Sequence, residues 1–331
     1  MREYSHVYVE EAARSWPDTE RVLSRFPRAT VISIDTAAEL FNRKQQHFQA
    51  QKQSPKLILA VDRGPFLFEG SERIKSFGNA PVHYTVPMRN CVYNCDYCFL
   101  QGMHRSANLL VTVNSEQALA AAEERYNATG GFFLSISYLT DLLGFEDVLP
   151  YCRRWIEWAR NRPEMVIEIR TKSDNFAVLS GVPPSENVVL VWSLSPEPVS
   201  RVHERGAASF RNRLFAARAA QQAGWPIRLC FDPVLRVPNW QELYRQAIGE
   251  TFRRLDPSRV ELVSYGVFRL HGDFLDRLRE VQTASPVVHA HYERSHGLST
   301  YPDNQIAEVR DLMETELSKV LPGERISFVH G

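Results

Sequence analysis

Three of the five cysteines in this chain of 331 residues lie close together in the sequence. Cys91, Cys95 and Cys98 form the pattern C-x3-C-x2-C, and cysteine thiolates are ligands for iron and zinc. A structural zinc site needs four ligands, so zinc would also require a histidine such as His83 or His104. Three thiolates can instead hold three irons of a [4Fe–4S] cluster and leave the fourth iron open to a small molecule. The pattern therefore predicts a metal centre of one of these two kinds.

The cysteine pattern follows an expected strand, the first of six that alternate with helices. Near-continuous apolar runs such as 188–192 are typical of parallel strands covered by helices. Six such units predict an α/β fold, either a doubly wound sheet or an incomplete barrel, with its chemistry at the C-terminal ends of the strands. The expected strands are His83–Met88, Gly131–Tyr138, Met165–Lys172, Asn187–Leu194, Ile227–Pro233 and Arg259–Val267. The expected helices are Ser115–Tyr126, Glu146–Asn161, Asp174–Leu179, Phe210–Ala223 and Trp240–Leu255.

The segments before and after this series are expected to form separate units. We expect an N-terminal α/β segment over 1–80, a barrel over 81–270, and a C-terminal extension over 271–331 that closes the barrel. Expected elements of the two flanking segments are the strands His6–Glu10, Ala29–Ile34, Leu57–Asp62 and Arg325–Val329, the helices Asp18–Phe26, Thr36–Gln51 and Gln305–Lys319, and a loop at Arg63–Ala80.

Composition excludes several classes of protein. Apolar residues make up 44% and charged residues 24%, which are ordinary globular values and argue against disorder or a coiled coil. The 39 basic and 39 acidic residues cancel, so any nucleic acid must bind through a local patch. The sequence contains no apolar run long enough for a transmembrane helix, and its first residues are polar. We therefore expect a cytoplasmic protein, without membrane contact, that is a monomer.

The cysteine pattern resembles the signature of the radical S-adenosylmethionine (SAM) superfamily, which is C-x3-C-x-aromatic-C after the first barrel strand. Tyr97 occupies the aromatic position. The resemblance implies a partial (β/α)6 barrel with an N-terminal α/β extension. It also implies a [4Fe–4S] cluster held by Cys91, Cys95 and Cys98, whose open iron binds the amine and carboxylate of SAM.

Within this superfamily, six segments resemble motifs of the spore photoproduct lyase family, in the same order and at similar spacing. Residues 95–101 resemble C-x-Y-C-Y-L-Q, 137–144 resemble S-C-T-S-D-x-x-G, 170–172 resemble V-T-K, 193–195 resemble S-I-N, 223–226 resemble A-G-Y-P, and 232–233 resemble A-P. With the N-terminal segment and the last strand, the likeness covers most of the chain.

The resemblance implies a lyase-type DNA repair enzyme. An electron donor such as flavodoxin or ferredoxin would drive cleavage of SAM to methionine and a 5′-deoxyadenosyl radical, which would abstract a hydrogen atom from a pyrimidine photolesion in DNA. Lys172 would pair with the SAM carboxylate, unless it is a surface lysine at a strand end. Asp141 would contact SAM or cap a helix, and the hydroxyl residues are alternatively turn formers. The residues implied in SAM binding are Tyr97, Thr140, Asp141, Lys172, Ser193 and Ser195.

The hydrogen-returning residues of the family are absent. The family has a cysteine where this chain has Tyr138, and a relay tyrosine where it has Phe99. Tyr138 is thus a candidate hydrogen donor, alongside the retained Tyr97, or simply an aromatic residue that fills the space of the thiol. Cys230 is a second candidate donor if its strand face points into the barrel, or otherwise a small buried residue. Asp232, on the same face, would contact substrate or pair with Arg228 or Arg236.

Arginine and aromatic residues are interleaved in the C-terminal third, a composition that can stack bases and contact phosphates. The family's segment is strongly basic there, whereas 291–301 contains only Arg294 as a fixed positive charge. DNA is therefore an expected partner through a local patch. The alternatives are a radical SAM enzyme for another nucleic-acid lesion, a nucleoside or a small molecule, and a non-catalytic protein that binds metal and nucleic acid. The interleaved residues are Phe268, Arg269, His271, Phe274, His291, Tyr292, Arg294, His296 and Tyr301.

Overall fold

A strand forms within each of the six expected barrel segments, the first of them shorter than expected, and neighbouring strands run parallel. The computed structural model describes residues 3–70 and 81–329. Eight strands form the sheet in the order β18-β14-β13-β11-β10-β9-β5-β4, and within the described ranges its two edge strands do not pair with each other, so the barrel is open. In chain order these are β4 (Phe68–Glu69), β5 (Val82–Tyr84), β9 (Phe133–Ser135), β10 (Val166–Thr171), β11 (Val188–Ser193), β13 (Ile227–Val234), β14 (Val260–Val267) and β18 (Ile326–Phe328).

The prediction of one continuous strand over His83–Met88 is wrong. Strand β5 ends at Tyr84, and β6 (Met88–Arg89) belongs to another sheet. Pro87 lies between them and has no N–H to donate to a strand ladder, which accounts for the break. The chain then reaches the cysteine loop at the end of the barrel where the parallel strands finish.

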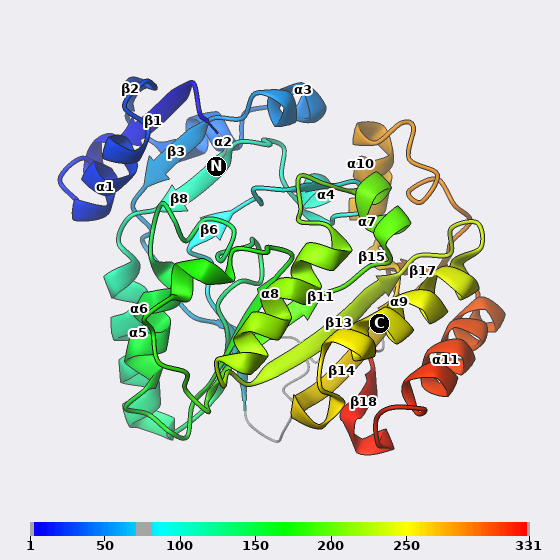
Figure 1. Cartoon of the computed structure of the whole chain (residues 1–331). Helices are drawn as coiled ribbons and strands as arrows, with labels where there is room; N and C mark the ends of the chain where they lie inside the picture. The colour runs from blue at the N-terminus through cyan, green and yellow to red at the C-terminus, as the bar shows by residue number, and fades with distance from the viewer. Residues whose placement is uncertain (1–2, 71–80, 330–331) are drawn as a thin grey trace.

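Helices cover the outside of the barrel sheet (Figure 1). They are α5 (Ser115–Thr129), α6 (Tyr151–Ala159), α8 (Phe210–Gln222) and α9 (Trp240–Arg254), whereas the helix expected at Asp174–Leu179 is only a 3-10 turn, η2 (Phe176–Leu179). Helix α8 shows why these segments pack as they do. Its buried residues Phe210, Leu214, Ala217 and Ala220 recur every three or four positions, on the face that contacts β11 and β13.

The N-terminal segment has a separate sheet, in the order β2-β1-β3-β8-β6. Its remaining strands are β1 (His6–Glu10), β2 (Thr30–Ile34), β3 (Leu57–Ala60) and β8 (Leu109–Thr112), and its helices are α1 (Pro17–Arg25), α2 (Ala37–Phe41) and α3 (Phe48–Gln53). The sheet takes β6 and β8 from beyond residue 81, so the two layers are interwoven near the cysteine loop. The expected domain boundaries stay predictions.

The single helix expected at Thr36–Gln51 is wrong, because the chain forms α2 and α3 with a turn between them. Gln45 lies in that turn with a left-handed φ of 59°. The side-chain amide of Gln46 donates to the carbonyls of Leu40, Phe41 and Arg43, which satisfies the open C-terminal end of α2. This local cap stops the first helix and allows α3 to begin in a new direction.

The C-terminal extension adds elements at both sides of the barrel. Helix α11 (Asp303–Leu317) packs on α9, β14 and β18 (Figure 1). A three-stranded antiparallel sheet, with β15 (Arg269–His271), β16 (Glu293–Ser295) and β17 (Leu298–Thr300), and helix α10 (Gly272–Val281) were not expected. Helix α10 approaches α4 (Leu100–Met103) closely: a Cβ on Gly102 would lie 2.2 Å from the Phe274 carbonyl oxygen. The extension therefore packs directly on the segment that follows the cysteines.

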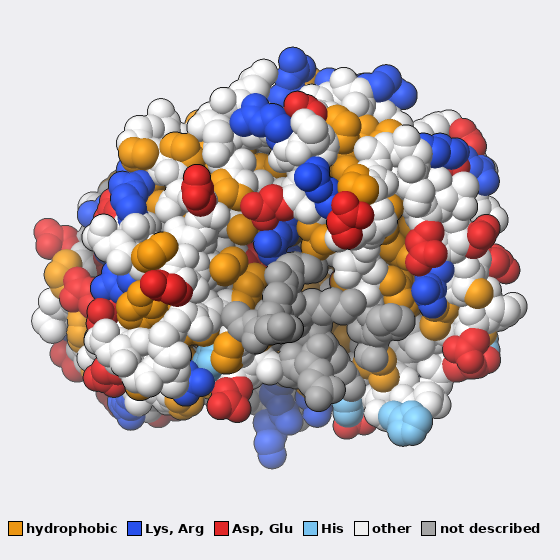
Figure 2. Space-filling model, turned by 90° about the horizontal axis from the view of Figure 1, so that it is seen from below, with side chains coloured by type: hydrophobic (Ala, Val, Ile, Leu, Met, Phe, Trp, Pro, Cys, Tyr) orange, Lys and Arg blue, Asp and Glu red, His pale blue; other side chains and the backbone are white. Residues whose placement is uncertain are grey.

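The surface agrees with the balanced composition. Lys and Arg side chains are interspersed with Asp and Glu on the face in Figure 2. In the ranges that the structure describes, no helix is both long enough and apolar enough to cross a membrane.

Candidate active site

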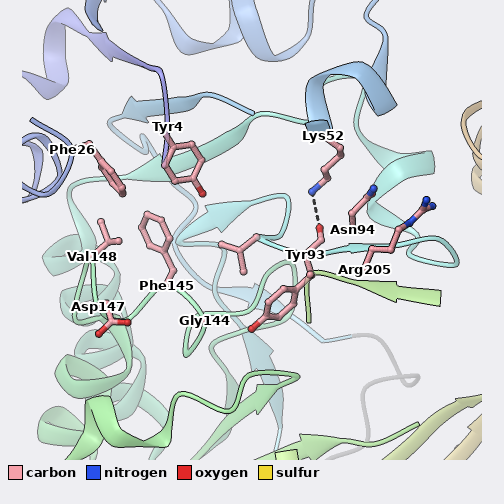
Figure 3. Close-up of a pocket in the computed structure, with 12 residues that line it drawn as sticks. Tyr4, Phe26, Lys52, Tyr93, Asn94, Gly144, Phe145, Asp147, Val148 and Arg205 are labelled. Atoms are coloured by element: carbon pink, nitrogen blue, oxygen red, sulfur yellow. Dashed lines mark hydrogen bonds between the residues drawn. The ribbon is translucent and has the colours of Figure 1, made fainter. Parts of the chain in front are cut away.

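The cysteine loop is held from two directions. Lys52, on α3 of the N-terminal segment, donates hydrogen bonds to the backbone carbonyls of Cys91 at 2.7 Å and Tyr93 at 2.8 Å (Figure 3). On the barrel side, β7 (Asn94–Cys95) pairs antiparallel with β12 (Glu204–Arg205), which follows α7 (Glu197–His203). The loop is thus fixed between the N-terminal sheet and the barrel.

The three cysteines of this loop are free thiols. They are close enough that Cys91 and Cys98 raise the pKa of Cys95. Burial raises the pKa of Cys91 to about 12, and burial also raises the pKa values of Cys95 and Cys98. Without a metal these thiols stay protonated at neutral pH, so metal binding must release their protons. Three thiols are a donor set that fits an iron–sulfur cluster. The positive charges of Lys52 and Lys172 favour the thiolate form of Cys98, which is the form that binds iron.

The zinc alternative lacks its fourth ligand. His83 packs against Phe132 and His104 against Phe41, each in an edge-to-face contact. No group of three or more His, Cys, Asp or Glu residues in the described ranges is arranged to hold one metal ion. Nδ1 of His83 and Nε2 of His104 are buried atoms without a hydrogen-bond partner among the described residues. Neither histidine is grouped with the cysteines there.

Glu204 connects the cysteine loop to the residues implied in SAM binding. Its carboxylate accepts hydrogen bonds from Tyr97, Ser195 (3.0 Å) and Arg213, and lies 3.8 Å from the Lys172 ammonium. The side chains of Glu204 and Arg213 are fully buried. Burial alone would raise the pKa of Glu204, but Arg213 and Lys172 outweigh it and hold the pKa below its usual value. The carboxylate is therefore an anion inside the protein.

Lys172 stays a cation in this setting. Burial is the largest single influence and would lower its pKa, but Glu204 and the neighbouring thiols of Cys95 and Cys230 together raise the pKa above its usual value. The ammonium also lies 5.9 Å from the centre of the Tyr97 ring. A charged, largely buried lysine beside the cysteine loop is suited to binding a carboxylate.

Sequence reasoning missed Glu204 and Arg213. One signal was available, since Arg213 lies one position before Leu214 on the buried face of the α8 pattern, where a charge needs a partner. Arg213 also donates to the backbone carbonyls of Ser193 and Ala208. The pair therefore ties β11 and the loop before α8 to the cysteine loop.

Asp141 acts mainly within the protein. Its carboxylate accepts hydrogen bonds from the backbone N–H groups of Gly144 and Lys172 and from the Thr171 hydroxyl. These contacts join the end of β10 to the 141–144 turn. The expected helix cap does not form, because the next helix of the described chain, α6, begins only at Tyr151. Thr140 is different, because its buried hydroxyl has no hydrogen-bond partner among the described residues and can serve a ligand.

A cavity of about 460 Å³ opens at the C-terminal ends of the barrel strands. Cys98, Tyr97 and Lys172 line one end of it, and Tyr138 lies in its wall. Ser193, Ser195 and Asp141 are buried behind this wall. The polar and aromatic lining residues are Tyr97, Cys98, Phe99, Ser135, Ser137, Tyr138, Glu168, Arg170, Lys172, Asp232, Phe268, Arg269, His271 and Phe274.

Tyr138 presents its ring to this cavity. The residue is 40% exposed, which is unusual for a large aromatic residue in this chain. Its ring centre lies 4.8 Å from that of Tyr84 and 6.3 Å from that of Phe99. An exposed ring in the cavity wall is accessible to a bound molecule, whereas an aromatic residue that only filled space would be buried.

The C-terminal aromatic residues mostly pack on one another. Phe268 stacks on Tyr292 at 4.6 Å, and Tyr292 contacts Tyr301 at 5.2 Å. Phe268 and Tyr301 are buried, so these rings form the core of the extension instead of an exposed platform. Arg294 is paired with Asp276 at 2.9 Å. The expected DNA patch is therefore smaller than the composition indicates.

A second cavity, of about 560 Å³, lies on the outer side of the cysteine loop. Tyr4, Phe26 and Phe145 stand on one side of it, and Asn94 and Arg205 on the other (Figure 3). Its wall includes Val92, Tyr93 and Asn94 of the cysteine loop but none of the three cysteines.

Gly144 allows Tyr93 to pack beneath this groove. A Cβ on Gly144 would lie 2.7 Å from the Tyr93 hydroxyl oxygen, which is too close. The residue at this position in the resembled motif is also glycine. The close approach of Tyr93 therefore explains why this chain has the same glycine at position 144 as the motif that it resembles.

Comparison with known proteins agrees with this geometry. The family profile described as "Spore photoproduct lyase" matches residues 4–330. A spore photoproduct lyase of a Geobacillus species is 20% identical over 340 residues, covering 97% of both chains. The Bacillus subtilis spore photoproduct lyase is 21% identical over 268 residues, covering 79% of this chain and 75% of the relative.

Solved structures share the fold. Spore photoproduct lyase complexed with dinucleoside spore photoproduct superimposes with a TM-score of 0.83 at 17% identity, covering 99% of this chain and 98% of the other. A double mutant of that enzyme, with bound AdoMet and dinucleoside spore photoproduct, gives a TM-score of 0.80 at 18% identity over the same shares. The expected partial radical SAM barrel with its N-terminal α/β extension is confirmed. Because the profile match spans nearly the whole sequence, this chain belongs to the spore photoproduct lyase family.

Proposed function

We propose that this protein is a radical SAM enzyme of the lyase type that repairs a pyrimidine photolesion in DNA. Membership of the spore photoproduct lyase family supports the reaction class. The observation that carries the proposal is that Cys98, Lys172 and Tyr138 line one cavity. One of the three thiols, a cation suited to a carboxylate and a phenol with an O–H group thus surround a single space.

Each part of the cofactor has residues that would hold it. Cys91, Cys95 and Cys98 would bind a [4Fe–4S] cluster, and Lys172 would bind the SAM carboxylate. When bound and reduced, cluster and SAM together supply a carbon-centred radical that abstracts a hydrogen atom. The SAM contacts proposed in addition to Lys172 are Tyr97, Thr140, Asp141, Ser193 and Ser195.

Tyr138 would return a hydrogen atom to the substrate radical. Its O–H bond breaks, a C–H bond forms on the substrate, and a phenoxyl radical remains on the protein. An electron from the donor that reduces the cluster, a flavodoxin or ferredoxin, and a proton from water would restore the phenol. The exposed ring in the cavity wall supports this role, and Tyr97, which is hydrogen-bonded to Glu204, would stay beside the cofactor.

A second candidate keeps this chemistry on another nucleic-acid lesion, a nucleoside or a small molecule. Arg170 and Asp232 favour it, because these charged residues line the cavity where the family motifs V-T-K and A-P have apolar residues. A lesion in nucleic acid is the substrate both in the first candidate and in one form of the second.

The proposal is tested by anaerobic reconstitution with iron and sulfide, reduction with dithionite, and measurement of 5′-deoxyadenosine. We expect 5′-deoxyadenosine from SAM and conversion of DNA that contains spore photoproduct, with undamaged DNA unchanged. Conversion of a different lesion only would select the second candidate. A reconstituted protein with zinc and no iron, or no 5′-deoxyadenosine under any condition, would exclude both.

A further inference from the structure

Four charged side chains in the cavity wall form a row of interacting groups. Glu168 and Arg170 occupy alternate positions of β10 and therefore share one face, with their charged groups 3.2 Å apart. Asp232, at the end of β13, accepts two hydrogen bonds from Arg269, at 2.7 and 2.9 Å. Arg170 also interacts electrostatically with both Asp232 and Arg269. The row therefore reads acid, base, acid, base.

Arg170 and Asp232 have hydrogen-bonding groups that remain available to a molecule in the cavity. Arg170 donates to Glu168 twice and to the Cys230 thiol, which leaves two of its five N–H groups unused among the described residues. Its side chain is 36% exposed, although it lies inside the barrel, so its exposed part faces the cavity. Asp232 has further lone pairs beyond the two that Arg269 uses.

The charges of the row cancel within it, and the neighbouring cation Lys172, which also acts on Asp232, is paired with the carboxylate of Glu204. This balance of charge decides the kind of ligand. A phosphate or carboxylate would need a net positive site, whereas two acids and two bases favour an uncharged group. The middle of the row presents donor, acceptor and donor from Arg170, Asp232 and Arg269. The imide edge of a thymine or uracil ring presents the complementary acceptor, donor and acceptor, from its two carbonyls and the N–H between them.

We propose that Arg170, Asp232 and Arg269 determine specificity by binding the imide edge of a pyrimidine base in this cavity. The inference rests on the proposed function and extends it to residues for which the family motifs have no counterpart. Phe99, Tyr138 and Phe274 line the same cavity and can pack on the face of the base. The imide then enters edge-first, with its ring between aromatic walls.

Gly266 makes room for the acid–base pair at the end of the row. A Cβ on Gly266 would lie 2.8 Å from both the Arg269 guanidinium and an Asp232 oxygen. Gly266→Ala would therefore displace the pair while leaving both charges in the chain. Gly323→Ala is a matched control, because a Cβ there meets no atom within 4 Å.

The test measures binding of the dinucleoside spore photoproduct, and of the same compound methylated at N3 of both rings, by calorimetry on the reconstituted enzyme. We expect N3 methylation to weaken binding by the wild type about tenfold or more, the usual effect of losing a hydrogen bond to a charged group. Asp232→Ala should bind both compounds equally weakly, and Arg170→Met should bind the unmethylated compound about tenfold more weakly. Gly266→Ala should weaken binding and Gly323→Ala should not.

Two outcomes would overturn the proposal: equal binding of the two compounds by the wild type, or unchanged binding in Arg170→Met and Gly266→Ala. Folding is checked by the melting temperature of each variant, and Gly266→Ala tests the pair if a charge variant does not fold. Formation of 5′-deoxyadenosine by the reduced wild type without lesion is measured separately. SAM cleavage without discrimination between the two compounds would refute only this inference. Discrimination without SAM cleavage would support it and refute the proposed function.

Discussion

Two regions of the active site are built from different kinds of residue. At the cysteine end, Lys172, Tyr97 and Glu204 form a buried network beside the thiols, and the first two match motifs of the family. Elsewhere in the cavity wall, Arg170 and Asp232 stand where those motifs have apolar residues, and Tyr138 stands where the family has cysteine. Under the proposed function, radical formation depends on shared residues, whereas contact with the substrate depends on residues particular to this chain.

The cysteine end should give the largest effect when it is broken. Cys95→Ala removes one of three thiols, and three ligands are already fewer than the four irons of the cluster. We expect loss of most bound iron and of all 5′-deoxyadenosine formation, measured by iron analysis and chromatography. Cys152→Ala is the matched control, since Cys152 is buried in α6. Full iron content in Cys95→Ala would show that the cluster has other ligands.

The wall should respond differently, because Tyr138 acts after SAM is cleaved. Tyr138→Phe keeps the ring and removes only the O–H group. We expect 5′-deoxyadenosine formation to continue, while repaired product falls at least about tenfold and side products accumulate, since a positioned hydrogen donor is lost. Tyr84→Phe, in the neighbouring ring, is the control. Normal product yield from Tyr138→Phe would assign the ring a packing role only.

Lys172 tests the cysteine end with a smaller effect. Lys172→Ala removes the cation that is expected to bind the SAM carboxylate. A charge-assisted hydrogen bond is worth roughly 1.5–3 kcal/mol, so SAM affinity should fall about ten- to hundred-fold while the iron content stays unchanged. Equilibrium binding of SAM to the reconstituted variant measures this, with partial recovery expected in Lys172→Arg. If Lys172→Ala bound SAM with wild-type affinity, Lys172 would have no role in SAM binding and would serve only as a partner of Glu204.

Sequence patterns predicted the elements whose signals are local. The alternation of apolar strands and helices gave the six barrel strands, because burial on both faces imposes long apolar runs. The break between α2 and α3 was missed, since it depends on a side-chain amide that bonds three carbonyls of the preceding turn. The antiparallel sheet at the C-terminal side was also missed, because its short strands carry little periodic signal.

The site residues that belong to sequence motifs could be predicted. Those that matter because residues distant in the sequence meet in the fold could not. The cysteines and Lys172 could be recognised from spacing and resemblance. Glu204 could not, because its importance comes from Tyr97, Arg213 and Lys172, which lie on three other segments. The expected pairing of Asp232 with Arg228 or Arg236 is wrong, because Arg228 pairs with Glu261 and Arg236 with Glu308. The partner of Asp232 is Arg269, 37 residues away. Charge pairing inside a barrel is a property of the assembled sheet.

The smallest expected effect concerns Cys230, the other candidate hydrogen donor. Cys230 is fully buried inside the barrel, and Arg170 donates to its sulfur at 3.3 Å. Burial raises the pKa of this thiol, so it stays protonated and could in principle give up a hydrogen atom. However, Arg170 lines the cavity and Cys230 does not, so the guanidinium lies nearer to a bound substrate than the sulfur does.

We therefore expect Cys230→Ser to change product yield by less than about twofold, since serine keeps an acceptor for Arg170. Product yield and 5′-deoxyadenosine are measured together, beside Tyr138→Phe. If Cys230→Ser lost product while Tyr138→Phe did not, the hydrogen donor would be the buried thiol. The substrate radical would then have to form close to Cys230, beyond Arg170. The hydrogen donor would again be a cysteine, as in the family. The contrast between shared residues near the cysteine loop and changed residues in the cavity wall would then no longer hold.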